Sequence, residues 1–460
     1  NTTASNNTAV GHEASLSNTT GTENTSIGQG ALRTTTTGNY NSATGNGALR
    51  ANTTGSSNVA NGVAALFSNT TASNNTAVGY QAGYANTTGT ENVAVGAFSL
   101  DTNTTGGHNT AIGTYALGDQ TTGSSNAAVG RQALKFNTTG SQNTALGREA
   151  LNRNTTASNN TAVGYQAGYS NTTGGSNSAF GRASLFTNTT GIYNVAIGEQ
   201  ALKSNTTASS NTAVGYRAGH AGTTGGGNVL IGNDVGFYGT TADNNVAIGN
   251  FAMHLNTTAD RNVAIGTSAL NQFNVTSNAD TYNTAVGGLA MYQTTTGTLN
   301  TAIGGQALQN NTTASNNTAV GYQAAYSNTT GTENVAVGRL ALNQATTASY
   351  NTAIGTNALQ DNTTGASNTA LGRSALTNNT TASDSTAVGY QAGHSNTTGR
   401  NNTFIGKTAG YTSNATGGRN TFVGHEAGYY LTTGERNTIL GRFSGNQGGL
   451  DIRTSSNNIV

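Results

Sequence analysis

The sequence predicts an all-β protein, a parallel β-solenoid of about 26 coils of 17 residues each. A motif of Asn, Thr or Val, Ala, Val or Ile, and Gly recurs along the chain, and its glycine falls every 17 residues from Gly11 to Gly266. The 460 residues include no proline, which cannot donate a hydrogen bond to a strand ladder. The β-branched residues cluster in one short run per repeat and do not recur at the helical period. A fixed period of this kind is typical of stacked repeat architectures.

The same period predicts the domain organisation, a single repeat array over residues 1–444. The step between motif glycines is 21 residues from Gly266 to Gly287, which predicts a loop insertion near residues 271–282 that includes Phe273 to Thr276. The segment 445–460 loses the period and is expected to lead into a following domain that is missing from this chain. At a spacing of ~4.8 Å per coil, the array would be a rod roughly 125 Å long.

Each position in the repeat has an expected place in the coil. The β-branched run favours a strand, and the Gly, Asn and Ser residues favour bends, so we expect two short strands and two tight bends per coil. Asn stands four residues before every motif glycine except at Ser385. In a stack, its side-chain amide can hydrogen-bond to the amides one coil above and below, although Asn also suits a turn without any ladder. The expected ladder residues include Asn75, Asn92, Asn109 and Asn160, with the motif glycines Gly79, Gly96, Gly113 and Gly164.

The strand residues are apolar or β-branched at successive positions, so both faces of the strand are expected to avoid water. One face must fill the interior of the coil, and the other needs a cover. A second copy of the chain is the simplest cover, which predicts a homo-oligomer, with the Asn-Thr-Thr arm facing water. Near the C-terminus the small Ala column gives way to larger residues, which predicts that the cross-section widens there. These residues are Phe404, Phe422 and Ile439.

Composition and residue spacing argue against several classes of function. Only 8% of the residues are charged and the net charge is +1, so neither nucleic acid nor a membrane surface is an expected partner. No apolar run approaches the ~18 residues of a membrane span. His220, His254 and His394 share one column but lie several coils apart, so no shared metal site is expected. The carboxylates are few and scattered, and only Asp101 and Asp119 are placed to approach each other across neighbouring coils. We therefore expect no enzyme activity, no cofactor and no metal.

One surface column combines basic and aromatic residues. It directly follows the motif glycine and supplies a basic–aromatic stripe, Tyr80, Arg131, Arg148, Tyr165, Arg182 and Tyr216. The stripe is either a solvated rim or a shallow surface for anionic or sugar ligands. The paired threonines raise a different hypothesis, ice binding, because each pair such as Thr87-Thr88 would place one outward Thr beside an outward Asn86.

The motif resembles repeats of known surface fibres. The Asn-x-Ala-Val/Ile-Gly core on short coils resembles the head repeat of YadA-like trimeric adhesins. The longer form, seen at Asn74 to Tyr84, resembles repeats of phage tail fibres, many of which end in an endosialidase-type chaperone domain, and residues 441–460 are similar to the lead-out of such repeats. The resemblance implies left-handed coils and a homotrimer.

The resemblance also implies a role. It points to the shaft or spacer of an extracellular or virion fibre, most of all a phage tail fibre. The shaft would hold a tip outside this chain that binds a host-surface glycan or protein receptor. The alternatives are a bacterial trimeric surface adhesin or extracellular filament protein, located on the cell surface, and an ice-binding β-solenoid.

Overall fold

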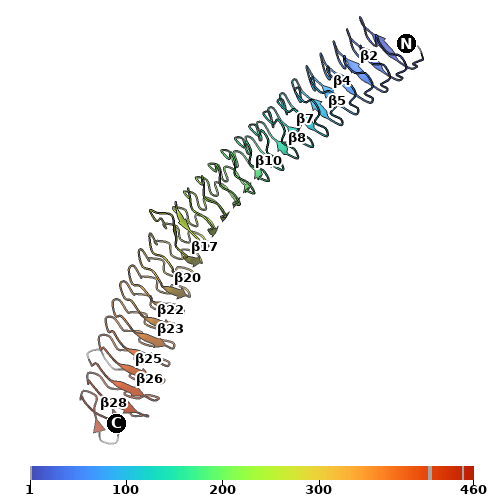
Figure 1. Cartoon of the computed structure of the whole chain (residues 1–460). Coiled ribbons are helices and arrows are strands. Elements are labelled where there is room, and N and C mark those ends of the chain that lie inside the picture. The colour runs from blue at the N-terminus through green and yellow to red at the C-terminus, as the bar shows by residue number, and fades with distance from the viewer. Residues whose placement is uncertain (1–2, 413–416, 448–449) are drawn as a thin grey trace. The chain divides into compact units, whose positions relative to one another are not determined.

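The chain folds into stacked coils of β-strands and turns, which confirms the all-β, parallel β-solenoid prediction. The computed structural model describes residues 3–412, 417–447 and 450–460, and these ranges contain no helix. Two compact units are distinguished, Asn1–Gly227 and Asn228–Val460. Within each unit the coils lie one on the next, and each coil contributes a short strand to a parallel sheet (Figure 1).

In the described part of the first unit the sheet strands are three residues long and one coil apart. They are β1 (Thr8–Val10), β2 (Thr25–Ile27), β3 (Ser42–Thr44), β4 (Val59–Asn61), β5 (Thr76–Val78), β6 (Val93–Val95), β7 (Thr110–Ile112), β8 (Ala127–Val129), β9 (Thr144–Leu146), β10 (Thr161–Val163), β11 (Ser178–Phe180), β12 (Val195–Ile197) and β13 (Thr212–Val214).

The second unit repeats this pattern and adds two short pairs. Its parallel sheet contains β14 (Val229–Ile231), β15 (Val246–Ile248), β17 (Val263–Ile265), β19 (Thr284–Val286), β20 (Thr301–Ile303), β21 (Thr318–Val320), β22 (Val335–Val337), β23 (Thr352–Ile354), β24 (Thr369–Leu371), β25 (Thr386–Val388), β26 (Thr403–Ile405), β27 (Thr421–Val423) and β28 (Thr438–Leu440). The short pairs are the parallel β16 (Ala259–Asp260) with β18 (Ala279–Asp280), and the antiparallel β29 (Asn446–Gln447) with β30 (Leu450–Asp451).

The 17-residue period places equivalent residues opposite each other. Between β5 and β6, for example, Ala77 pairs with Ala94 and Val78 pairs with Val95. The central Ala is buried in the coil, while the residues on either side of it point to the other face of the sheet and are partly exposed. The Ala column therefore lines the interior, and the Val/Ile column lies outside.

Each coil contributes one strand to the main sheet, where the sequence suggested two strands per coil. The reason is that the backbone of each coil enters the left-handed region repeatedly, in many coils at three residues other than glycine, as at Ser57 (φ 59°), Ala64 (φ 57°) and Leu66 (φ 48°). These residues turn the chain too often for a second strand of regular geometry. Backbone hydrogen bonds from coil to coil still close this side, as from Leu49 N to Ala65 O at 3.0 Å.

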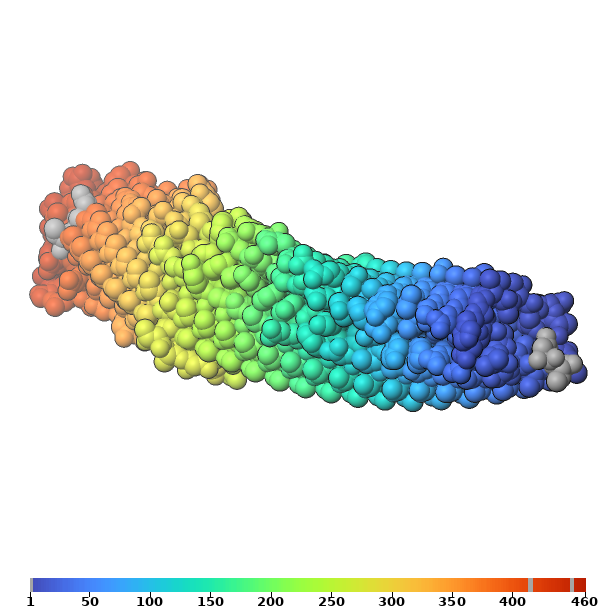
Figure 2. All heavy atoms as spheres, turned by 90° about the horizontal axis from the view of Figure 1, so that it is seen from above, coloured from blue at the N-terminus to red at the C-terminus, as the bar shows by residue number. Residues whose placement is uncertain are grey.

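The interior is filled by the Ala column and by a Leu column four residues after the motif glycine. Leu49 and Leu66 belong to this column and are buried in spite of their left-handed φ angles. A left-handed φ costs about 1–2 kcal/mol, and burying a Leu side chain contributes about 1.5–3 kcal/mol, so the burial offsets the strain. Figure 2 shows the atoms of each unit closely packed on the face in view.

Near the C-terminus the interior accommodates the larger residues of the Ala column, which the sequence had linked to a wider cross-section. Phe404 and Phe422 are fully buried in the Ala column, with ring centroids 5.6 Å apart. The coils that carry them have Gly410 and Gly428 in the Leu column, and a Cβ at Gly410 would lie 2.5 Å from the ring of Phe404. The large and small residues have exchanged columns, which conserves the filled volume.

The motif glycine brings successive coils into close contact. Gly164 has φ +135°, and a Cβ built on it would lie 2.7 Å from the carbonyl oxygen of Gly181 in the next coil. Gly79, Gly96 and Gly113 have the same geometry. Both the dihedral angle and the space therefore require glycine.

The departures from the period have defined structures. Phe273, which the sequence placed on the inserted loop, is fully buried, and the exposed part of the insertion begins at Asn274. The segment 445–460 contains the β29–β30 pair. After this pair, Asn458 continues the Asn column, because its backbone N–H donates to Asn437 Oδ1 at 2.9 Å.

Substituting Gly164 by Ala is expected to lower the melting temperature far more than substituting Gly30 by Ala. Gly30 has φ +65°, nothing lies within 4 Å of its added Cβ, and Ala64 already occupies the equivalent position of another coil. Both substitutions carry left-handed backbone strain of about 1–2 kcal/mol, but only the Cβ added at Gly164 also clashes with the backbone of the next coil. Circular dichroism melting of the two variants measures the difference. Equal decreases in melting temperature would show that the contact between coils does not require glycine at Gly164.

Candidate functional site

The predicted Asn column is a buried hydrogen-bonded ladder. Asn75 is almost fully buried. Its Oδ1 accepts from the backbone N–H of Asn92 in the next coil at 2.9 Å, and its Nδ2 donates to the carbonyl oxygen of Gly89 at 3.0 Å. Asn109 and Asn160 repeat both contacts, accepting from the backbone N–H of Asn126 and Asn177 and donating to the carbonyl oxygens of Gly123 and Gly174. The amide therefore bonds to backbone groups, and in many coils it also bonds to the amide of the neighbouring coil as the sequence suggested, for example from Asn126 Nδ2 to Asn109 Oδ1 at 3.2 Å.

A second Asn column, which the sequence analysis had placed outside, is also buried. Asn86 is 1% exposed, so the expected outward Asn is wrong. Its Nδ2 donates to Asn69 Oδ1 at 3.0 Å, and the Nδ2 of Asn103 donates to Asn86 Oδ1 at 2.8 Å. Where the next residue of the column is Ala345, the buried Oδ1 of Asn328 has no partner. The in-phase recurrence of this Asn was the signal that could have identified the column.

The paired threonines present only one exposed side chain per coil. Thr87 Oγ1 donates to the carbonyl oxygen of Thr104 at 2.9 Å, so its hydroxyl is used between coils. Thr88 is exposed. Because Asn86 is buried, the surface array invoked for ice binding reduces to this single column of threonines.

All six residues of the basic–aromatic stripe are exposed. The structure brings two of them together, with the Arg148 guanidinium 5.4 Å from the ring centroid of Tyr165. The other contacts involve residues outside the stripe, since Arg182 pairs with Glu199, Tyr80 meets Phe98 edge-on at 5.2 Å, and Arg217 lies over Tyr216 at 4.8 Å. The stripe is therefore a row of locally paired side chains.

A second aromatic column lies five residues after the motif glycine. The rings of Phe67 and Tyr84 stack at 5.2 Å, and those of Tyr169 and Phe186 stack at the same distance. In the second unit, the His394 ring stacks on Tyr411 at 5.0 Å. Stacking of this kind supports neighbouring coils but leaves fewer ring faces open for a ligand.

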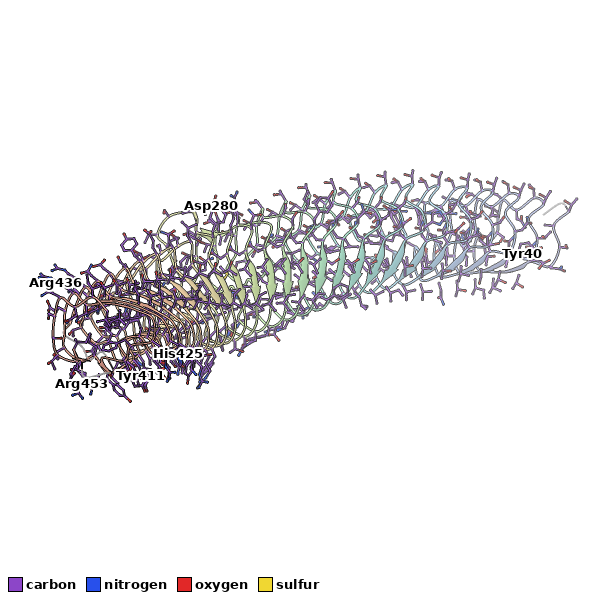
Figure 3. All side chains as sticks on the ribbon, turned by 90° about the horizontal axis from the view of Figure 1, so that it is seen from below. Tyr40, Asp280, Tyr411, His425, Arg436 and Arg453 are labelled. Carbon is purple, nitrogen blue, oxygen red and sulfur yellow. The ribbon has the colours of Figure 1, made fainter. Side chains whose placement is uncertain are left out.

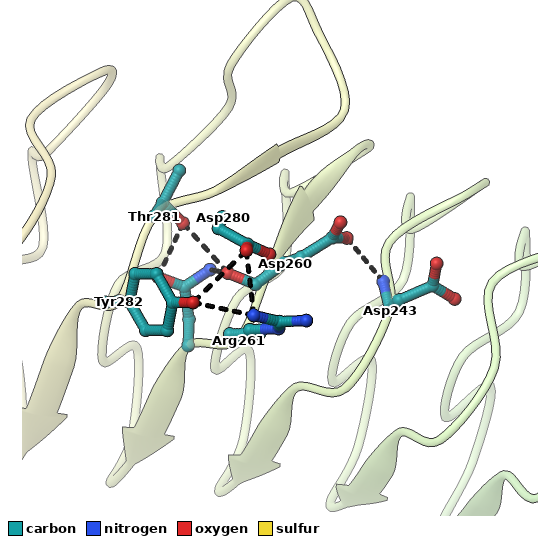
Figure 4. Close-up of polar contacts among 7 residues, drawn as sticks. Asp243, Asp260, Arg261, Asp280, Thr281 and Tyr282 are labelled. Atoms are coloured by element: carbon teal, nitrogen blue, oxygen red, sulfur yellow. Dashed lines mark hydrogen bonds and ion pairs between the residues drawn. The ribbon is translucent and has the colours of Figure 1, made fainter.

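The inserted loop carries a polar cluster that closes on itself (Figure 4). Arg261 Nη1 lies 2.8 Å from Asp280 Oδ2 and donates to Tyr282 Oη at 2.6 Å. Asp260 is buried and accepts from the backbone N–H of Asp243 at 2.6 Å. Burial raises the pKa of the Asp260 carboxyl. In the described residues, no group of three or more His, Cys, Asp or Glu side chains is arranged to hold a metal ion.

Asp101 is the carboxylate with the most perturbed environment. It approaches the next coil above Gly118, where an added Cβ would lie 3.7 Å from Asp101 Oδ1. Burial raises the pKa of Asp101 to about 6, with a smaller contribution in the same direction from Asp119 and an opposing one from Lys135. As the sequence suggested, Asp101 and Asp119 approach each other closely enough for the charge of Asp119 to raise the pKa of Asp101.

Comparisons with known proteins give no family. No model of a known protein family matches the chain, and no curated protein matches it either. Within the described part of the chain, no helical segment has the length and apolar character needed to cross a bilayer.

Substituting Asp101 by Asn is expected to stabilise the protein at pH 7.5 and to have little effect at pH 3.5. The folded-state pKa of about 6 exceeds the ordinary value of 3.8. At low pH the Asp101 carboxyl is protonated in both the folded and the unfolded state and does not affect the free energy of unfolding. As the pH rises from about 4 to 6, the unfolded state loses this proton more readily than the folded state, so the protein becomes less stable. Because the Asp101 side chain is only half-buried, we expect the substitution to raise the free energy of unfolding at pH 7.5 by about 1 kcal/mol. Melting temperatures across this pH range measure it. A difference independent of pH would contradict the assigned titration.

Proposed function

We propose that the chain is the structural shaft of an extracellular or virion fibre, most of all a phage tail fibre, and that it catalyses no reaction. The observation that carries the proposal is the column of contacts that joins neighbouring coils within a unit, such as Asn75 to Asn92 and Thr87 to Thr104. Bending a unit would require many such contacts to be stretched together, so each unit is stiff. Stiffness suits a spacer that holds a binding tip away from a particle.

We also propose that the outer face of the sheet is covered by further copies of the same chain. The Val/Ile column on this face is partly exposed, for example Ile27 at 41%, Leu146 at 48% and Phe180 at 38%. The residues two positions before them, on the same face, are Thr, Ser, Val or Ala, and none of the residues in either column is charged. Apart from Thr44 and Asn61 the Val/Ile column is apolar, and exposed apolar surface that recurs from coil to coil marks an interaction site.

A second copy fits this face better than an unrelated partner because its coils repeat at the same spacing. Residues of the two copies can then meet in the same way along the sheet, as isologous or cyclic contacts require. The uncharged face leaves no ion pair to select a different protein. The resemblance to trimeric adhesins and tail fibres favours three chains. A location on a virion or outside the cell, and a receptor-binding tip elsewhere in the fibre, follow from the same resemblance.

The oligomer is tested by three substitutions on adjacent strands, Leu146→Asp, Val163→Asp and Phe180→Asp together. These side chains are on the outer face, so the coils should keep their circular dichroism spectrum while the charges break the association. Light scattering should give about three chains per particle before the change and one chain after it. The matched control places Asp at the exposed Thr156, Thr173 and Thr190 of the same coils and should leave the oligomer intact. A stable monomer of the unaltered chain would rule out self-association.

The role as a shaft is tested on the particle that carries the full-length polypeptide. An antibody against this segment should label the fibre along its length, between the particle and the distal tip, in electron microscopy. Label confined to the distal tip would contradict a spacer role, and label on a soluble, unattached protein would contradict a fibre.

A further inference from the structure

A basic hollow lies on the turns of the second unit. Its volume is about 330 Å³, and it is lined by Thr398, Arg400, Asn401, Gly418, Arg419 and Glu435. These residues come from the turns that precede β26, β27 and β28. Arg436 follows directly on Glu435 and lies at the outer surface of the last coils (Figure 3).

Two arginines are held next to each other across the coil step. The backbone N–H of Arg419 donates to the carbonyl oxygen of Arg400 at 2.9 Å, which fixes their relative position. Both side chains are exposed. Gly418 contributes no side chain to the hollow, and an added Cβ would lie 2.8 Å from the carbonyl oxygen of Arg400.

These arginines differ from the arginine that occupies the equivalent turn position elsewhere. Arg261 stands five residues before its motif glycine, as Arg419 does, and its guanidinium is neutralised by Asp280 and bonded to Tyr282 (Figure 4). Among the described residues, no carboxylate lies within ion-pair distance of Arg400 or Arg419. Two like charges on neighbouring coils repel each other, and an anion placed between them would relieve that repulsion.

The lining residues indicate the class of anion. Guanidinium groups pair with carboxylates and phosphates through two parallel N–H donors, and a carboxylate is the smaller of these groups and the one that sugars carry on their own ring. Asn401 and Glu435 at the rim are suited to the hydroxyl groups of a polyol, and the lining contains no aromatic ring that could stack on a flat apolar ligand. A volume near the lower end of the ~300–1,000 Å³ range of ligand pockets suits one or two rings.

We propose that this hollow binds a sugar acid, with the carboxylate between Arg400 and Arg419 and the hydroxyl groups at Asn401 and Glu435. The fibre would then contact an acidic glycan through its side as well as through a tip. Binding depends mainly on charge at an open surface, so it is weak and decreases as salt screens the arginines. The inference holds whether or not the chain forms an oligomer, because its lining comes from one unit of one chain.

The test uses the full chain and glucuronate as the probe, with glucose as the neutral counterpart, followed by saturation-transfer NMR and calorimetry at low salt. Glucuronate should bind and glucose should not, and raising the salt to 0.5 M should weaken the binding. Arg400→Gln and Arg419→Gln should each weaken it at least tenfold. The matched control Arg50→Gln removes the same charge from an exposed arginine of the first unit that lies outside the basic–aromatic stripe, and it should leave binding unchanged.

A variant that is expected to strengthen binding completes the test, because a loss of folding could not produce stronger binding. Glu435→Gln removes a negative charge from the rim and should tighten glucuronate binding several-fold. Equal binding of glucose and glucuronate, or glucuronate binding that is unaffected by Arg400→Gln and Arg419→Gln, would overturn the proposal. Binding of inorganic sulfate without binding of glucuronate would also overturn it, because the hydroxyl-directed rim would then have no role.

Discussion

The close contact between motif glycines in successive coils is the constraint on which the structure depends. With no side chain at Gly164, the carbonyl oxygen of Gly181 can approach to a distance that a Cβ would not allow. This approach sets the two coils at the spacing of a parallel sheet. Only at that spacing can the N–H of Asn92 reach Asn75 Oδ1, and only then do the Ala residues of neighbouring strands face each other.

The buried columns of the coil are fixed by the structure, whereas the positions on the turns can carry different side chains. The two Asn columns, the Ala column and the Leu column are buried, and most of the Asn amides are hydrogen-bonded within the chain. Charged residues are confined to the turns and the columns next to them, which leaves the outer face of the sheet uncharged. That separation is why one repeat can support both self-association along the sheet and different surface chemistry on the turns.

The period made the fold predictable, and local geometry decided what remained. The recurrence of Asn75 and Gly79 in phase was sufficient to predict a stack of coils. The sequence could not show that Asn86 points inward, because an isolated Asn-Thr-Thr arm is polar and its side-chain directions depend on the left-handed turns on either side. It also showed two apolar strand faces without showing that Ala77, and not Val78, lines the interior. The exchange of bulk between Phe404 and Gly410 depends on contacts within the filled coil, which no single position reveals.

The repeat also decides which polar side chains meet on the turns. In a regular coil each turn residue meets its equivalents one coil away, so its partners are prescribed by the repeat. The step of 21 residues brings Asp280 and Tyr282 to Arg261, and that cluster is satisfied internally. Arg419 lies beside Arg400 through the same backbone contact that regular coils make, as from Glu91 N to Ser73 O, and the lining of their hollow includes one carboxylate, Glu435. Where the repeat brings two arginines together in this way, the surface is suited to an anion from outside the chain.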